Sequence, residues 1–173
     1  MATEEALPGD PAAFCMPGGA FERRTYYACA RLRALPHLLA LYQAPILVTD
    51  MDVGLSAPPD PIWQALGTAD CGLIRFPAQS QPLWQEFFLA LAAFRPSASG
   101  RRFAAMLAAY VEHFLERREW VWSLDQAALY SAAAEAERTL TGWRYAVLSP
   151  ALIASSDRPS ASAVFRHHVA SQS

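Results

Sequence analysis

The stretch APILVTDMDVGL at residues 44–55 is an apolar run that ends in two carboxylates, Asp50 and Asp52, one residue apart. Its Ile46–Thr49 part is uncharged, rich in branched side chains and preceded by Pro45, and it predicts a strand buried on both faces. Side chains alternate between the two faces of a strand, so both aspartates point the same way if the strand geometry continues through them.

Helical and strand-like patterns alternate around this stretch. Apolar residues at helical spacing run from Phe21 to about Leu41, and Pro36 is expected to divide this helix or to begin a second one. Further along, the patterns predict a short helix at 63–66, longer helices at about 102–117 and 125–140, and strands at 71–76, 87–94, 143–148 and 163–168.

The order of these elements indicates an α/β protein. Strands that alternate with helices are typical of a mostly parallel mixed sheet flanked by helices, and we expect one such domain over residues 21–173. Residues 1–20 are rich in Ala, Pro and Gly and predict a flexible leader.

Composition narrows the function classes. With 173 residues, of which 53% are hydrophobic and 17% charged, the chain can build one sizeable core. The net charge of -2 gives no electrostatic reason to expect binding to nucleic acid. All fourteen basic residues are Arg, which excludes lysine nucleophiles and the phosphate-loop lysine. Three scattered cysteines, no signal-peptide pattern and no long apolar run favour a reduced, cytoplasmic protein without a membrane span.

The two aspartates suggest a cation site. Adjacent carboxylates repel each other, and each raises the pKa of the other unless a cation lies between them. Mg²⁺ and Mn²⁺ prefer such oxygen ligands, and ligands of open α/β sheets bind beyond the carboxyl ends of strands. Asp50 and Asp52 therefore predict a divalent metal site. The alternative is a solvated loop in which an aspartate caps the next element.

Three segments, taken in their order along the chain, resemble segments of nucleotide-sugar glycosyltransferases of the GT-A type. The resemblance is strongest to family 8 and related bacterial enzymes. The three segments are the Arg-Leu helix at 26–39, the strand with Asp-X-Asp at 45–53 and the Asp-Gln helix start within 122–130. The resemblance covers roughly residues 25 to 150. It implies a GT-A fold and the transfer of a hexose from a nucleotide-diphosphate donor, expected to be UDP-linked, to an acceptor that the sequence does not identify.

The resemblance also implies roles for single residues. Asp50 and Asp52 would bind the Mn²⁺ or Mg²⁺ ion that bridges the donor diphosphate. Arg31 would approach the donor sugar or the first aspartate, and the alternative is a simple salt bridge. Asp125 and Gln126 would lie near the transferred sugar. The alternative for Asp125 is a helix N-cap, and both roles are compatible.

A C-terminal histidine often completes the metal shell in such enzymes. The segment 164–169 ends an apolar strand in two histidines, of which at most one would ligate because neighbours face opposite sides. We favour His167, and a solvent-exposed histidine pair is the alternative. The segment 84–96 matches the part that usually offers polar groups to the sugar. Its polar residues Gln85 and Glu86 are expected at the surface, and contact with the substrate is the alternative.

The N-terminal part is abbreviated relative to a GT-A domain, which normally begins with a strand–helix–strand unit that holds the nucleotide base. About twenty turn-rich residues precede the Arg-Leu helix here. We therefore expect an incomplete nucleotide pocket, a chain that is the C-terminal part of a longer protein, or a partner chain that supplies the missing half.

Two other functions stay open. One is a degenerate, non-catalytic glycosyltransferase-like binding module. The other is a phosphatase of the haloacid dehalogenase type, in which Asp50 would be the nucleophile and Asp52 the acid/base. That mechanism needs a later Lys or Arg and a further acidic pair for Mg²⁺, whereas Glu135 and Glu137 are predicted to lie on a helix surface.

Overall fold

The computed structural model describes residues 20–50, 52–76, 86–117, 121, 123–154 and 163–167. The predicted leader therefore lies outside the described residues, except for Ala20, which begins the first helix. In chain order the elements are α1 (Ala20–Tyr42), β1 (Ile46–Thr49), β2 (Val53–Leu55), α2 (Asp60–Leu66), β3 (Cys71–Arg75), β4 (Phe87–Phe94), α3 (Ala98–Glu116), α4 (Leu124–Thr139), β5 (Tyr145–Leu148), a 3-10 turn (Pro150–Leu152), β6 (Ile153–Ala154) and β7 (Phe165–His167).

The strands form two mixed sheets, which confirms the α/β class. The main sheet has the order β1-β4-β3-β5, and the small sheet has the order β2-β7-β6. The expectation of a mostly parallel sheet is confirmed in part. Strands β1, β3 and β5 run in the same direction, but β4 lies between β1 and β3 and runs antiparallel to both, and β2 runs antiparallel to β7. Only the β3–β5 and β6–β7 pairs of the described strands are parallel. The physical reason is that β4 follows β3 without a described crossover helix, which a parallel pair would need.

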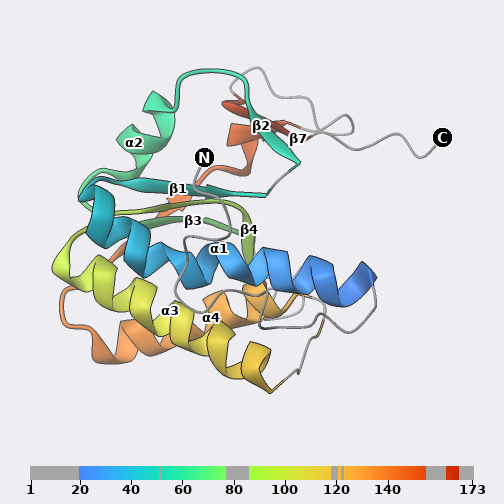
Figure 1. Cartoon of the computed structure of the whole chain (residues 1–173). Helices are drawn as coiled ribbons and strands as arrows, with labels where there is room; N and C mark the ends of the chain where they lie inside the picture. The colour runs from blue at the N-terminus through green and yellow to red at the C-terminus, as the bar shows by residue number, and fades with distance from the viewer. Residues whose placement is uncertain are drawn as a thin grey trace.

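Helices cover the main sheet on one face, and the small sheet lies on the other side. Figure 1 shows α1, α3 and α4 together below the main sheet, with α2 and the small sheet above it. The buried apolar residues form two cores accordingly. One core lies between the sheet and α1, α3 and α4, and the other lies between the sheet, α2 and the small sheet.

Helix α1 is continuous, so the predicted division at Pro36 is wrong. A proline inside a helix removes one backbone hydrogen bond and costs about 3 kcal/mol. Leu32, Leu35 and Leu39 surround it in sequence and are fully buried in the core that α1 shares with α3 and α4. We infer that this packing offsets the cost of the proline.

Strand β1 lies at the end of the main sheet, among the described strands, with β4 as its neighbour. The expectation of burial on both faces is confirmed in part, because Ile46 and Val48 pack against the core on the helix side and Leu47 packs against the core on the small-sheet side. Val48 is buried, and the other three residues of the strand are half-buried. An uninterrupted apolar run does not distinguish a central strand from an end strand, because both need branched side chains that pack on a pleated surface.

The remaining predicted elements are confirmed with shifted ends. Helix α2 begins three residues earlier than expected and α3 begins four residues earlier, at Ala98. The short strands β2 and β6 were not predicted, because two or three residues carry no readable periodicity. Within the described part of the chain, none of the helices has the length and apolarity that crossing a membrane requires.

Candidate functional site

The candidate site lies where β1 ends. The backbone N–H of Asp50 donates to the carbonyl of Ala90 at 3.3 Å, and the N–H of Val53 donates to the carbonyl of Asp50 at 3.1 Å. The chain therefore turns between β1 and β2, and the strand geometry does not continue through both aspartates. Asp50 is half-buried and Asp52 is exposed on this turn.

Strand β4 is irregular beside the same turn. Its register with β3 shifts between Leu73 and Ile74, and the consecutive residues Ala90 and Leu91 both belong to the core on the small-sheet side. Such irregularities bend a strand and occur often beside functional sites. Here the carbonyl of Ala90 is the acceptor that fixes the backbone of Asp50.

Arg31 joins two carboxylates at this place. Its guanidinium, on α1, donates to Asp50 and also to Oδ2 of Asp125 at 3.1 Å. Its Nε donates to the carbonyl of Ala28 at 3.0 Å, which ties the side chain to its own helix. The side chains of Arg31 and Asp125 are only 17% and 12% exposed. Three predicted site residues from separate parts of the chain thus lie together.

Asp125 lies in the first turn of α4 but is not its cap. The N-cap is Ser123, in a left-handed conformation with φ of 62°, and the helix begins at Leu124. The carboxylate of Asp125 is instead turned to Arg31. Gln126 follows it on α4 and is half-buried, and among the described residues its side chain forms no hydrogen bond with this trio. The roles of Asp125 and Gln126 stay predictions.

The backbone brings His167 to the same turn. Strand β2 follows Asp52 directly and pairs with β7, so that Val53 lies opposite His167. The side chain of His167 lies outside the described residues, and so does all of His168. Within the described ranges, no group of three His, Cys, Asp or Glu residues is placed to hold a metal ion. The ligand set of Asp50, Asp52 and His167 therefore stays a prediction.

The electrostatics of the site centre on Asp50. Burial raises the pKa of its carboxyl above the ordinary value, and Arg31 opposes this by its charge and hydrogen bond. The nearby charges of Asp125 and Asp52 raise the pKa further. One guanidinium thus pairs with two carboxylates, those of Asp50 and Asp125. Such a site can accept a further cation, or hydrogen bonds from sugar hydroxyls.

Cys29 adjoins the site but has no nucleophilic character. It lies on α1, is fully buried, and has its pKa raised to about 12, first by burial and then by the charge of Asp125. Cys71, on β3, is equally buried, and burial raises its pKa as well. Both thiols are therefore protonated at neutral pH.

This gives a first prediction. When the native protein is treated with iodoacetamide at pH 8, Cys29 and Cys71 are expected to stay unmodified, because both thiols are buried and burial raises the pKa of both. For Cys29, a pKa of about 12 leaves about one thiolate in ten thousand at this pH. Peptide mass spectrometry measures the labelling, and the same treatment in guanidinium should modify both residues. Equal labelling of Cys29 in the native and the unfolded protein would contradict its burial.

Glu86 is buried, so its expected surface position is wrong. It is 7% exposed and its carboxylate accepts from the guanidinium of Arg75, which also donates to the hydroxyl of Tyr145 at 2.9 Å. Arg75 is paired with Phe87 across β3 and β4, which places it beside Glu86. Opposite charges near the facing ends of two neighbouring strands were the available signal. Gln85 lies outside the described residues.

The sequence matches no protein-family model, and the comparison with curated proteins returned no match.

Proposed function

We propose that this chain is a cytoplasmic glycosyltransferase-like protein with a GT-A-like fold that transfers a sugar from a nucleotide-diphosphate donor. The observation that carries the proposal is the contact of Arg31 with Asp50 and Asp125. These residues come from the three segments on which the resemblance rests, and they are 19 and 94 residues apart in sequence. Their convergence at a strand end is what a shared site requires.

The arrangement of the strands is compatible with this proposal. The two aspartates follow β1 at its carboxyl end, where ligands of open α/β sheets bind. The irregular strand β4 runs antiparallel between β1 and β3, which gives the mixed sheet that we expect of such a domain.

We propose that Asp50 and Asp52 hold Mn²⁺ or Mg²⁺, with His167 as a third ligand. The carboxylate oxygens of Asp50 and Asp52 suit a hard divalent ion, and the charges of Asp125 and Asp52 act on Asp50 in the sense that favours a cation there. Such an ion, when bound, offsets the charge that develops on the leaving nucleoside diphosphate.

Arg31 and Asp125 have a different proposed role. The ion pair orients both side chains in a mostly buried position, from which Arg31 can donate to the donor sugar or its diphosphate. Asp125 and Gln126 then lie at the start of α4 on the side of the transferred sugar.

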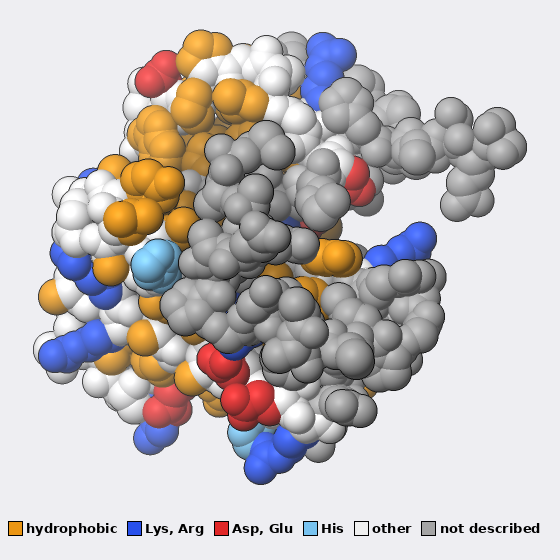
Figure 2. All heavy atoms as spheres, in the orientation of Figure 1, with side chains coloured by type: hydrophobic (Ala, Val, Ile, Leu, Met, Phe, Trp, Pro, Cys, Tyr) orange, Lys and Arg blue, Asp and Glu red, His pale blue; other side chains and the backbone are white. Residues whose placement is uncertain are grey.

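A non-catalytic binding module is the second candidate, and the position of β1 favours it. This strand ends the main sheet as described, and an end strand can pair with another strand. Leu41 and Tyr42, just before it, are 61% and 60% exposed, and Figure 2 shows apolar side chains gathered over α2 and the C-terminal end of α1. A partner chain or a preceding half of a longer protein would add the base-binding strands along this edge.

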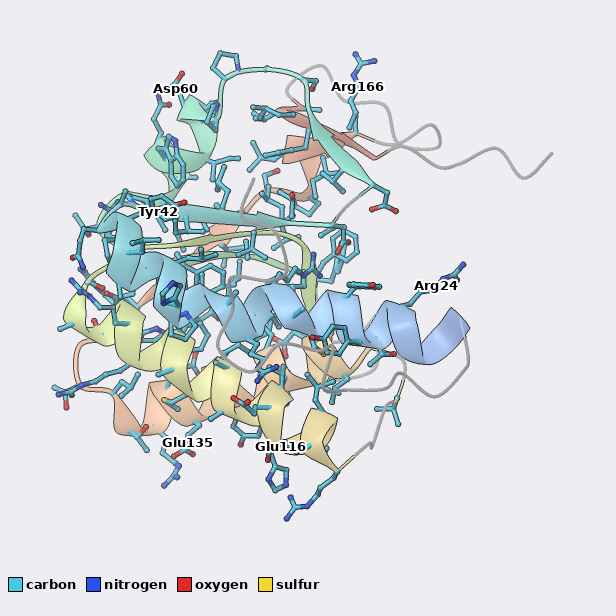
Figure 3. All side chains as sticks on the ribbon, viewed as in Figure 1. Arg24, Tyr42, Asp60, Glu116, Glu135 and Arg166 are labelled. Carbon is cyan, nitrogen blue, oxygen red and sulfur yellow. The ribbon has the colours of Figure 1, made fainter. Side chains whose placement is uncertain are left out.

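A thermal-shift experiment tests the proposed function. With Mn²⁺ and a panel of nucleoside diphosphates, we expect a rise of about 5 °C with the preferred nucleotide at saturation. The rise should disappear in Asp50→Ala and in Asp52→Ala, which lose a metal ligand. The matched control is Asp60→Ala, an exposed aspartate on α2 that Figure 3 labels, and it should respond like the wild type.

The other outcomes separate the alternatives. No response to any nucleotide with either metal would contradict donor binding and favour the non-catalytic module. Hydrolysis of small phosphomonoesters that is lost in Asp50→Asn would favour the dehalogenase-type phosphatase.

A further inference from the structure

The space between Asp50 and Asp125 already contains a positive charge that belongs to the chain. The guanidinium of Arg31 contacts both carboxylates, and the distance from its Nη2 to Oδ2 of Asp125 is 3.1 Å. A divalent ion that binds Asp50 would come close to this guanidinium in a half-buried place. Two cations at such a distance repel each other, and the repulsion is less screened there than at an exposed surface.

We infer that Arg31 is an internal counter-ion that competes with the divalent metal for Asp50. In the absence of nucleotide the guanidinium bridges Asp50 and Asp125. When a metal ion binds Asp50, the guanidinium gives up this contact and stays on Asp125. The inference rests on the proposed metal site and assigns it a regulation: the chain's own cation keeps affinity for the bare metal low.

The two ends of the bridge differ in a way that decides which contact is released. Asp125 is 12% exposed and is carried by the first turn of α4, whereas the side chain of Asp50 is 36% exposed and lies on a turn. The Nε of Arg31 is bound to the carbonyl of Ala28, so its own helix positions the guanidinium without Asp50. The contact with Asp125 is the less exposed of the two and is less screened by solvent, so we expect the guanidinium to stay there when a metal ion binds Asp50.

The charge balance explains why nucleotide would matter. A divalent ion on Asp50 would put a second cation beside the guanidinium of Arg31, which already contacts this carboxylate. A diphosphate adds negative charge between the metal and the guanidinium. It can accept hydrogen bonds from Arg31 that Asp50 no longer accepts. Metal and nucleoside diphosphate should therefore bind more tightly together than either binds alone.

Binding of Mn²⁺ alone tests the inference, measured by the loss of the free-ion signal in electron paramagnetic resonance. Arg31→Gln removes the competing charge, and we expect it to bind Mn²⁺ at least about tenfold more tightly than the wild type. Arg31→Lys keeps the charge and should bind like the wild type. The matched control Arg33→Gln, on the same helix and paired with Glu112 at 2.9 Å, should also leave the affinity unchanged.

A second measurement does not depend on a variant that folds. In wild-type protein titrated with diamagnetic Mg²⁺, the side-chain Nε–H resonance of Arg31 should shift with the same midpoint as metal binding, because the guanidinium leaves Asp50. A resonance that stays in place while Mg²⁺ binds would overturn the inference.

The failures are distinguishable. If the wild type and Arg31→Gln bind Mn²⁺ equally, or Arg31→Gln binds it more weakly, the competition is refuted and the proposed metal site stands. If neither protein binds Mn²⁺, with or without UDP, the metal site and the competition are both refuted.

Discussion

Phe103→Ala should lower the free energy of unfolding by about 3–5 kcal/mol, which is the usual cost of deleting a fully buried aromatic ring. Phe103 lies on α3 and is 0% exposed. Its ring stacks on Phe94 of β4, with centroids 6.2 Å apart and planes at 22°, and contacts the ring of Trp143, with centroids 4.8 Å apart. The substitution therefore removes contacts between α3, the main sheet and the segment before β5.

Urea unfolding at 25 °C, followed by tryptophan fluorescence and by circular dichroism, measures this loss. Phe103→Leu keeps most of the volume and should cost about 1 kcal/mol. Phe114 lies on the same helix and is only half-buried, so Phe114→Ala is the matched control with the smaller expected loss. A midpoint for Phe103→Ala equal to that of Phe114→Ala would contradict the packing described around α3.

The helices and most strands could be predicted because their signals are local. On α3, Phe103, Leu107 and Val111 recur at helical spacing, and all three are fully buried. The ends of this helix were less predictable. It begins at Ala98 because the side chain of Ser97 accepts from the N–H of Gly100. The sequence alone does not show which of the neighbouring Ser residues caps the helix.

The direction of the strands could not be predicted, because strand pairing depends on residues far apart in the chain. The segment of β4 reads as one apolar run whether it lies parallel or antiparallel to its neighbours. The burial of Glu86 also depends on pairing, since Arg75 reaches it only across the β3–β4 ladder. A sequence lists the charges but does not place them opposite each other.

The sequence predicted which residues form the candidate site, but not which of them contact each other. The order of the motifs led to Arg31, Asp50 and Asp125, and in the structure Arg31 contacts both aspartates. The sequence allowed either a salt bridge or a donor-binding role for Arg31. The structure shows the salt bridge, to two carboxylates at once, and the donor-binding role stays a prediction.

Asp70→Ala is the other substitution with a large expected effect, of about 3 kcal/mol in the free energy of unfolding. Asp70 precedes β3 and is 6% exposed. Its Oδ1 accepts from the hydroxyls of Ser97 and Ser99, at 2.5 and 2.8 Å, and its Oδ2 accepts from the backbone N–H of Arg144 at 2.9 Å. Alanine would leave these three donors without their acceptor. It would also release Ser97, whose oxygen caps α3.

The controls for this prediction distinguish a loss of stability from a loss of ligand binding. Asp70→Asn keeps one carbonyl acceptor and should lose less stability than Asp70→Ala, while the exposed Asp60→Ala should change it by less than about 0.5 kcal/mol. Asp70 fixes the start of β3 against α3 and β5, whereas Asp50 lies on the turn after β1. Below its unfolding temperature Asp70→Ala should therefore keep the response to Mn²⁺ and nucleotide that Asp50→Ala loses. An unfolding midpoint of Asp70→Ala equal to that of the wild type would mean that this carboxylate does not hold the three elements together.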